Sequence, residues 1–119
     1  MEDERIWDFE RSLWLGGETH YRDLVDESCV MVLPQPPYVF SGSGAKERLS
    51  DTPRWQKVAF SDQTVSRPQD GLIVIGYTAR AQHSDRGDYV AHCTSTLRRL
   101  AHEEWRVVQH QQTLTPTAR

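Results

Sequence analysis

The second half of the chain contains four long β-type runs, and each is separated from the next by a short turn. Residues 68–71 (Pro-Gln-Asp-Gly) and 85–88 (Asp-Arg-Gly-Asp) have the composition of tight reversals. Runs of this length joined by short turns pair with their neighbours as an antiparallel meander. We therefore predict a four-stranded antiparallel sheet, with strands over 55–65, 72–81, 89–100 and 105–113.

Helical periodicity marks the beginning of the chain. Ile6, Phe9 and Leu13 recur at helical spacing, which predicts a helix over residues 3–15 that ends at Gly16. A second, short helix should follow, with Thr19 as its N-cap. Its inner face is predicted to carry Tyr21, Leu24 and Val25.

Short elements connect the predicted helices to the sheet. Residues 29–33 and 38–40 have the branched and aromatic composition of brief strands. A third short helix is expected around 45–49, and residues 51–53 should end it. Helices followed by a run of strands are typical of an α+β fold, and 119 residues correspond to one domain over 1–119.

Charge and hydropathy exclude several classes of protein. The net charge is −3 and the only basic pair is Arg98-Arg99, so we expect no nucleic-acid partner. No apolar run approaches the 18 residues of a membrane span, so we expect no membrane partner. The acidic start MEDERIWDFE is unlike a signal peptide, which predicts a cytoplasmic protein. In that compartment Cys29 and Cys93 are expected to be reduced, buried thiols.

Four segments together resemble the nuclear transport factor 2-like superfamily, which includes the SnoaL-like and ketosteroid-isomerase-like proteins. They are the helix–glycine–helix opening RSLWLGGETHYRDLV, the strand with a proline-rich exit CVMVLPQPP, the small-residue helix start SGSGA, and the closing run WRVVQHQQT. The closing run is the most specific of them. The chain is most similar to the uncharacterised branch of that superfamily.

The resemblance implies a cone, in which a curved antiparallel sheet wraps around two or three N-terminal helices and encloses a pocket. It also implies a homodimer that pairs through the convex face of the sheet. Members of the superfamily include isomerases, cyclases, dehydratases, transport adaptors and oligomerising hubs. The fold therefore does not determine the function.

The last predicted strand carries polar residues on both of its faces. Alternation puts His110 and Gln112 on one face, with Gln109 and Gln111 on the other. The resemblance implies that the face of His110 points into the cone and that the other face helps to build the dimer interface. The alternative is that His110 is a hydrogen-bonded core or interface histidine, and both roles are ordinary for this residue type.

The neighbouring predicted strand contains an alternating Thr-Ser-Thr run. The resemblance implies that Thr94 and Thr96 point into the pocket and that Cys93 and Ser95 point outward. The alternative for this run is plain β-propensity. Because the deep pocket positions are then Thr and Gln rather than a basic residue, we expect a small neutral ligand.

Three aromatic residues complete the predicted ligand-binding set. Tyr77 is placed in the cavity with its hydroxyl available as a donor, while Tyr21 and Trp55 are placed at the mouth or floor. For each aromatic residue alone, a place in the core is the favoured interpretation. The full predicted set is Tyr21, Trp55, Tyr77, Thr94, Thr96, His110 and Gln112.

Catalysis would require an acid–base group in this pocket. Asp23, Asp26 and Glu27 are expected at the solvated end of a helix, and Asp62 on an exposed part of a strand. His110 is therefore the predicted catalytic base, with Tyr77 or Tyr21 as the donor.

Three hypotheses follow from the sequence: a small-molecule-binding domain, a lyase or isomerase that uses His110, and an oligomerisation module. We expect neither a metal nor another cofactor. The histidines lack CxxC or HExxH spacing, and SGSGAK lacks the full phosphate-loop pattern.

Overall fold

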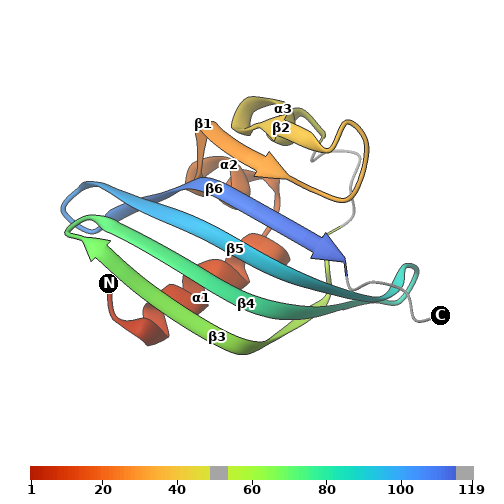
Figure 1. Cartoon of the computed structure of the whole chain (residues 1–119). Helices are drawn as coiled ribbons and strands as arrows, with labels where there is room; N and C mark the ends of the chain where they lie inside the picture. Colours follow the sequence, from red (N-terminus) through yellow and green to blue (C-terminus); the bar gives the residue numbers. More distant parts are fainter. Residues whose placement is uncertain (49–53, 115–119) are drawn as a thin grey trace.

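One six-stranded sheet curves around the N-terminal helices in the computed structural model, which describes residues 1–48 and 54–114 (Figure 1). The strand order is β2-β1-β6-β5-β4-β3. β1 runs parallel to β6, and every other neighbouring pair is antiparallel. The predicted α+β cone is confirmed, and the predicted meander corresponds to β3–β6. The strands are β1 (Val25–Val32), β2 (Val39–Ser41), β3 (Lys57–Gln69), β4 (Leu72–His83), β5 (Gly87–Ala101) and β6 (Glu104–Leu114).

Three helices accompany the sheet: α1 (Asp3–Leu15), α2 (Glu18–Leu24) and α3 (Gly42–Arg48). α1 lies across one face of β3–β6, whereas α3 lies beside β1 and β2 (Figure 1). The predicted bounds of α1 are confirmed. The N-cap of α2 is Gly17 rather than Thr19, and Val25, predicted on the inner face of the helix, is its C-cap and the first residue of β1. The predicted end of the third helix, at 49 and 51–53, lies outside the described residues.

Alternation along β4 and β5 defines the buried face of the sheet. In β4 the inward series is Ile73, Ile75, Tyr77, Ala79 and Ala81, and the inward facing of Tyr77 is as predicted. Small side chains at the last two positions give α1 room to pack against the sheet. In β5 the inward series is Ala91, Cys93, Ser95 and Leu97.

A β-bulge interrupts strict alternation in β6. Thr96 pairs with Gln109, but the next residue, Leu97, pairs with Val107, so Val108 is an extra residue on β6. A bulge of this kind shifts the facing of the strand by one position. As a result, Val107 and His110 are both buried, although residues three positions apart face opposite sides of a regular strand.

The register of β5 against β6 corrects part of the predicted pocket. Ser95 pairs directly with His110, and residues directly opposite in an antiparallel pair share a face. The inward placement predicted for Thr94 and Thr96 is therefore wrong, because these two residues lie on the convex face. The outward placement predicted for Cys93 and Ser95 is wrong for the same reason, since both are buried.

The convex face is polar at its centre. Gln109 donates to Thr94 Oγ1 at 3.1 Å and accepts from Thr96 Oγ1 at 3.0 Å. Gln111 is exposed on the same face, as predicted.

Two further findings concern the whole described chain. Cys29 and Cys93 are free and buried, which confirms the predicted thiols. Among residues 1–48 and 54–114, no helix has the length and apolar character needed to cross a membrane.

Candidate functional site

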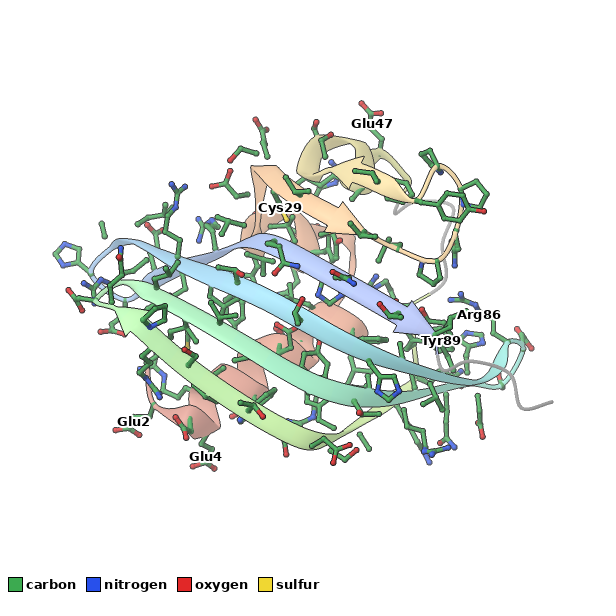
Figure 2. The ribbon with its side chains drawn as sticks, viewed as in Figure 1. Glu2, Glu4, Cys29, Glu47, Arg86 and Tyr89 are labelled. Carbon is green, nitrogen blue, oxygen red and sulfur yellow. The ribbon has the colours of Figure 1, made fainter. Side chains whose placement is uncertain are left out.

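A cavity of about 260 Å³ opens between the helices and the β1–β6 side of the sheet. Arg86 and Tyr89, which lie near the β4–β5 turn, are among the residues that line it (Figure 2). Aliphatic and aromatic side chains form most of its surface, with a few polar groups among them. The lining residues are Leu13, Trp14, Tyr21, Val25, Met31, Leu33, Gln35, Phe40, Ala45, Arg54, Trp55, Arg86, Tyr89, Val107, His110 and Gln112.

Two hydrogen bonds fix the polar group on the β6 wall of the cavity. Tyr89 donates its hydroxyl proton to Gln112 Oε1 at 2.6 Å, and Gln112 Nε2 lies 3.0 Å from His110 Nε2. Because the amide nitrogen is the donor, His110 Nε2 is the acceptor, and the imidazole proton is on Nδ1. His110 is thus a neutral hydrogen-bonding group with its Nε2 atom beside the cavity.

A hydroxyl connects the other side of His110 to a buried carboxyl group. His110 Nδ1 lies 2.7 Å from Ser95 Oγ, which donates to Glu10 Oε2 at 2.6 Å. Glu10 comes from α1, whereas Ser95 comes from β5. The Glu10 side chain therefore extends from α1 to the buried face of the sheet, where Ser95 links its carboxyl group to the imidazole of His110.

A second chain of donors reaches the same carboxyl oxygen. Trp14 Nε1 donates to the Tyr77 hydroxyl at 3.1 Å, and that hydroxyl donates to Glu10 Oε2. Both chains of donors thus end on one atom of a side chain that is 0% exposed. Glu10 Oε1 has no hydrogen-bond partner in the described part of the chain.

Burial dominates the protonation of this network. It raises the pKa of Glu10, against the opposing effect of the Ser95 and Tyr77 hydrogen bonds. It lowers the pKa of His110 to about 4 and raises the pKa of Tyr77 well above its ordinary value. All three shifts favour uncharged forms, as expected for groups removed from water.

Stacked aromatic rings and two arginines form the mouth of the cavity. The Trp55 and Tyr89 rings are stacked, with centroids 5.1 Å apart. The Arg86 guanidinium lies 4.2 Å above the Trp55 ring, and the Arg54 guanidinium lies 5.1 Å above the Tyr21 ring. Cation–π contacts at these distances hold long side chains in place at the edge of a pocket.

The cavity brings together four of the seven predicted ligand-binding residues: Tyr21, Trp55, His110 and Gln112. Tyr77 faces inward as predicted, but the prediction that it lines the cavity is wrong. Its hydroxyl is bound between Trp14 and Glu10 instead. Thr94 and Thr96 lie on the other side of the sheet.

Glu10 is the functional candidate that the sequence analysis missed. It lies four residues after Ile6 and three before Leu13, so it belongs to the inward stripe of α1. The sequence prediction used only the apolar members of this stripe. A carboxylate at a position within the stripe was the signal that could have identified Glu10. Arg54 and Arg86 had no comparable signal, because each belongs to a connection between strands or helices rather than to a periodic element.

No group of three metal-ligating side chains occurs among the residues of known placement.

Asp62, expected to be exposed, is exposed and accepts a hydrogen bond from Thr78 Oγ1 at 3.1 Å. Asp26 was expected at a helix end but lies on β1, and its carboxylate pairs with Arg98.

No protein-family model and no curated protein matches the chain. Solved structures do. The chain is similar to a nuclear transport factor 2-like protein of unknown function in nutrient uptake from Rhodospirillum rubrum, at TM-score 0.81 and 14% identity, over 98% of this chain and 100% of that one.

Two other similar solved structures have names that refer to different functions. A putative ketosteroid isomerase from Parabacteroides distasonis aligns at TM-score 0.79 and 16% identity, over 94% of this chain and 86% of that one. The calcium/calmodulin-dependent kinase II hub homology domain of Chlamydomonas reinhardtii aligns at TM-score 0.71 and 16% identity, over 95% and 94%. At these identities the comparisons establish the fold alone.

Proposed function

We propose that this chain, which has the nuclear transport factor 2-like fold, binds a small organic molecule in its cavity. The volume of about 260 Å³ lies just below the usual range for drug-sized ligands, so the cavity suits a smaller molecule. A mostly apolar surface with a few converging polar groups is the usual composition of such sites.

One observation carries this proposal: the neutral imidazole of His110 lies on the cavity wall, where its Nε2 atom accepts a hydrogen bond from the side chain of Gln112. A ligand hydroxyl can replace that amide as the donor to Nε2, and the released amide can then donate to the ligand oxygen. The deep part of the site is therefore suited to an uncharged hydroxyl or carbonyl group.

Filling the cavity tests the proposal. Ala45 lines the cavity from α3, whereas Ala59 is exposed on β3, so Ala45→Phe and Ala59→Phe add the same ring inside and outside the site. Binding of benzyl alcohol and benzamide would be measured by saturation-transfer NMR. We expect binding to wild type and to the Ala59 variant, and none to the Ala45 variant. Equal binding to all three proteins would refute the proposal.

A second candidate function is acid–base catalysis of the lyase or isomerase type. The observation that favours it is the arrangement Glu10–Ser95–His110, in which a carboxyl group lies behind the imidazole. His110 Nε2 would take a proton from carbon next to a substrate carbonyl. The Nδ1–H of the resulting imidazolium would donate to Ser95 Oγ, which donates in turn to Glu10 Oε2. Tyr21, which lines the cavity, is the candidate donor to the carbonyl oxygen.

The catalytic candidate has its own test. Once a substrate is found, His110→Gln should abolish turnover, while Ser95→Ala should lower kcat by about 10²-fold, as expected for loss of an acid–base contribution. Turnover that is unchanged by His110→Gln would exclude this mechanism without affecting the binding proposal.

We also propose self-association through the convex face, where Thr94, Thr96, Gln109 and Gln111 lie. Tyr38, Val30 and Val39 add exposed apolar surface from the β1–β2 edge. One structural neighbour is a hub homology domain, which is in line with an oligomerisation role. Light scattering should give twice the mass of the 13.8 kDa chain, and a monomer at micromolar concentration would contradict the proposal.

A further inference from the structure

We propose that the ligand of the cavity is an organic acid, with its carboxylate bound at the mouth by Arg54 and Arg86 and its apolar body enclosed by the aromatic walls. This inference rests on the proposed binding function. It departs from the neutral ligand expected from the sequence, because that expectation considered only the deep positions. Those positions remain uncharged, and the charge lies at the mouth.

The distribution of charge around the cavity is the first observation. The chain has 17 acidic and 14 basic residues, excluding histidine, so it is acidic overall. The cavity reverses this balance: its described lining contains two arginines and no aspartate or glutamate. Like charges along an apolar wall focus the electrostatic potential inside a cleft. A negatively charged group is therefore attracted to this part of the molecule.

Arg54 provides the second observation. Its Nε donates to the Gly16 carbonyl oxygen at 2.9 Å, and its guanidinium covers the Tyr21 ring. Within residues 1–48 and 54–114, no carboxylate pairs with it. Burial and the neighbouring charge of Arg86 lower the pKa of Arg54. Burying a cation costs solvation energy, and an anionic ligand beside Arg54 would offset that cost.

Arg86 is held by stacking in a way that suits the same anion. Its guanidinium lies over Trp55, which stacks in turn on Tyr89. Stacking engages the flat face of a guanidinium, whereas carboxylates bind along its N–H edge. The stack therefore orients Arg86 and is compatible with an ion pair to a ligand at the mouth.

The rest of the lining indicates the body of the ligand. Trp14, Phe40 and Val107 contribute apolar surface to the lining. The small volume limits the ligand to about one ring with a short side chain. An arylalkanoic acid has this shape, and a hydroxyl on the ring would reach toward His110.

Phenylacetate and phenylacetamide are suitable probes, because they have nearly the same shape and differ in charge. Acetate serves as the anion without the body. Dissociation constants would be measured by isothermal titration calorimetry at one low ionic strength. We expect phenylacetate to bind at least about tenfold more tightly than phenylacetamide, as charge-assisted hydrogen bonds imply. Acetate should bind more weakly than either.

Variants then test the named residues. Arg54→Gln and Arg86→Gln should each weaken phenylacetate by about tenfold and change phenylacetamide by less than about twofold. Arg80→Gln is the matched control, because Arg80 is exposed on β4 and does not line the cavity. It should leave both constants unchanged.

The outcomes separate the two proposals. If phenylacetamide binds as tightly as phenylacetate, the arginine inference is wrong while the cavity function stands. The inference also fails if Arg54→Gln and Arg80→Gln weaken phenylacetate equally. If neither probe binds wild type, while benzyl alcohol and benzamide do, the organic acid is again excluded. If no probe binds at all, the proposed function falls and the inference falls with it.

Discussion

The Nδ1 atom of His110 lies 3.6 Å from the Oε2 atom of Glu10, and the hydroxyl of Ser95 bridges them. One residue lies at the cavity wall and the other is enclosed between α1 and the sheet. Glu10 and His110 are far apart in the sequence, so it is the fold that brings them together. Ser95 thereby connects the cavity wall to a carboxyl group that is buried behind it.

His110 should make the stability of the protein dependent on pH. Its folded pKa of about 4 lies below the ordinary 6.5, so it contributes stability that is present above pH 6.5 and is lost as pH falls through 4. The shift corresponds to on the order of 3 kcal/mol. Urea unfolding of wild type and His110→Gln between pH 4 and 8 measures it. Wild type should lose stability relative to the variant on acidification, and parallel curves would contradict the prediction.

Glu10 should act with the opposite sign. Its pKa is raised in the folded state from 4.5, so its contribution is fully present below pH 4.5 and is lost as pH rises through the folded value. Glu10→Gln removes this dependence, so its free energy of unfolding should rise relative to wild type as pH increases. Exposed Glu27→Gln should follow the wild-type curve. A Glu10→Gln curve that also follows wild type would argue against a raised pKa.

The hydrogen bond from Trp14 to Tyr77 should couple these two residues energetically. Tyr77→Phe leaves the buried Trp14 N–H without its acceptor, and Trp14→Phe removes one of the two hydrogen bonds of the Tyr77 hydroxyl, so each should cost about 1–3 kcal/mol. The double variant leaves fewer unpaired groups than the sum of the single variants. A double-mutant cycle by chemical denaturation should therefore be non-additive by about 0.5–3 kcal/mol, whereas additive costs would contradict the contact.

Neighbouring hydroxyl residues on β5 provide a matched pair for the facing of that strand. Ser95→Ala removes a buried hydroxyl that contacts both Glu10 and His110, so it should cost about 1–3 kcal/mol. Thr94→Ala removes the acceptor of one exposed hydrogen bond from Gln109, so it should cost less, at most about 1 kcal/mol. The reverse order of costs would restore the facing predicted from the sequence.

These residues show how far sequence reasoning extends. Apolar periodicity located α1, and turn composition located the β3–β6 meander, because both patterns depend on local physics. The inward facing of His110 was also correct. The predicted facing of Thr94 and Ser95 was wrong because the strand register and the bulge at Val108 depend on pairing between strands. The sequence of one strand alone does not show how it pairs with its neighbour.

Other parts of the site depend on contacts between distant segments. In the sequence, Glu10 resembles an ordinary surface residue of a helix unless the stripe of Ile6 and Leu13 is extended through it. Arg54 and Arg86 meet at the mouth because the segment before β3 and the β4–β5 turn converge in space. Neither connection has a periodic pattern from which that convergence could be predicted.

The central claim, that the cavity binds small molecules, is tested most directly by the indole N–H signals of the four tryptophans. Trp14 and Trp55 line the cavity, whereas Trp7 and Trp105 do not. In a 1H–15N NMR titration with benzyl alcohol and phenylacetate, we predict that the Trp14 and Trp55 signals shift together and saturate. The Trp7 and Trp105 signals should stay in place. Shifts confined to Trp7 and Trp105, or no shift in any indole signal, would contradict the account.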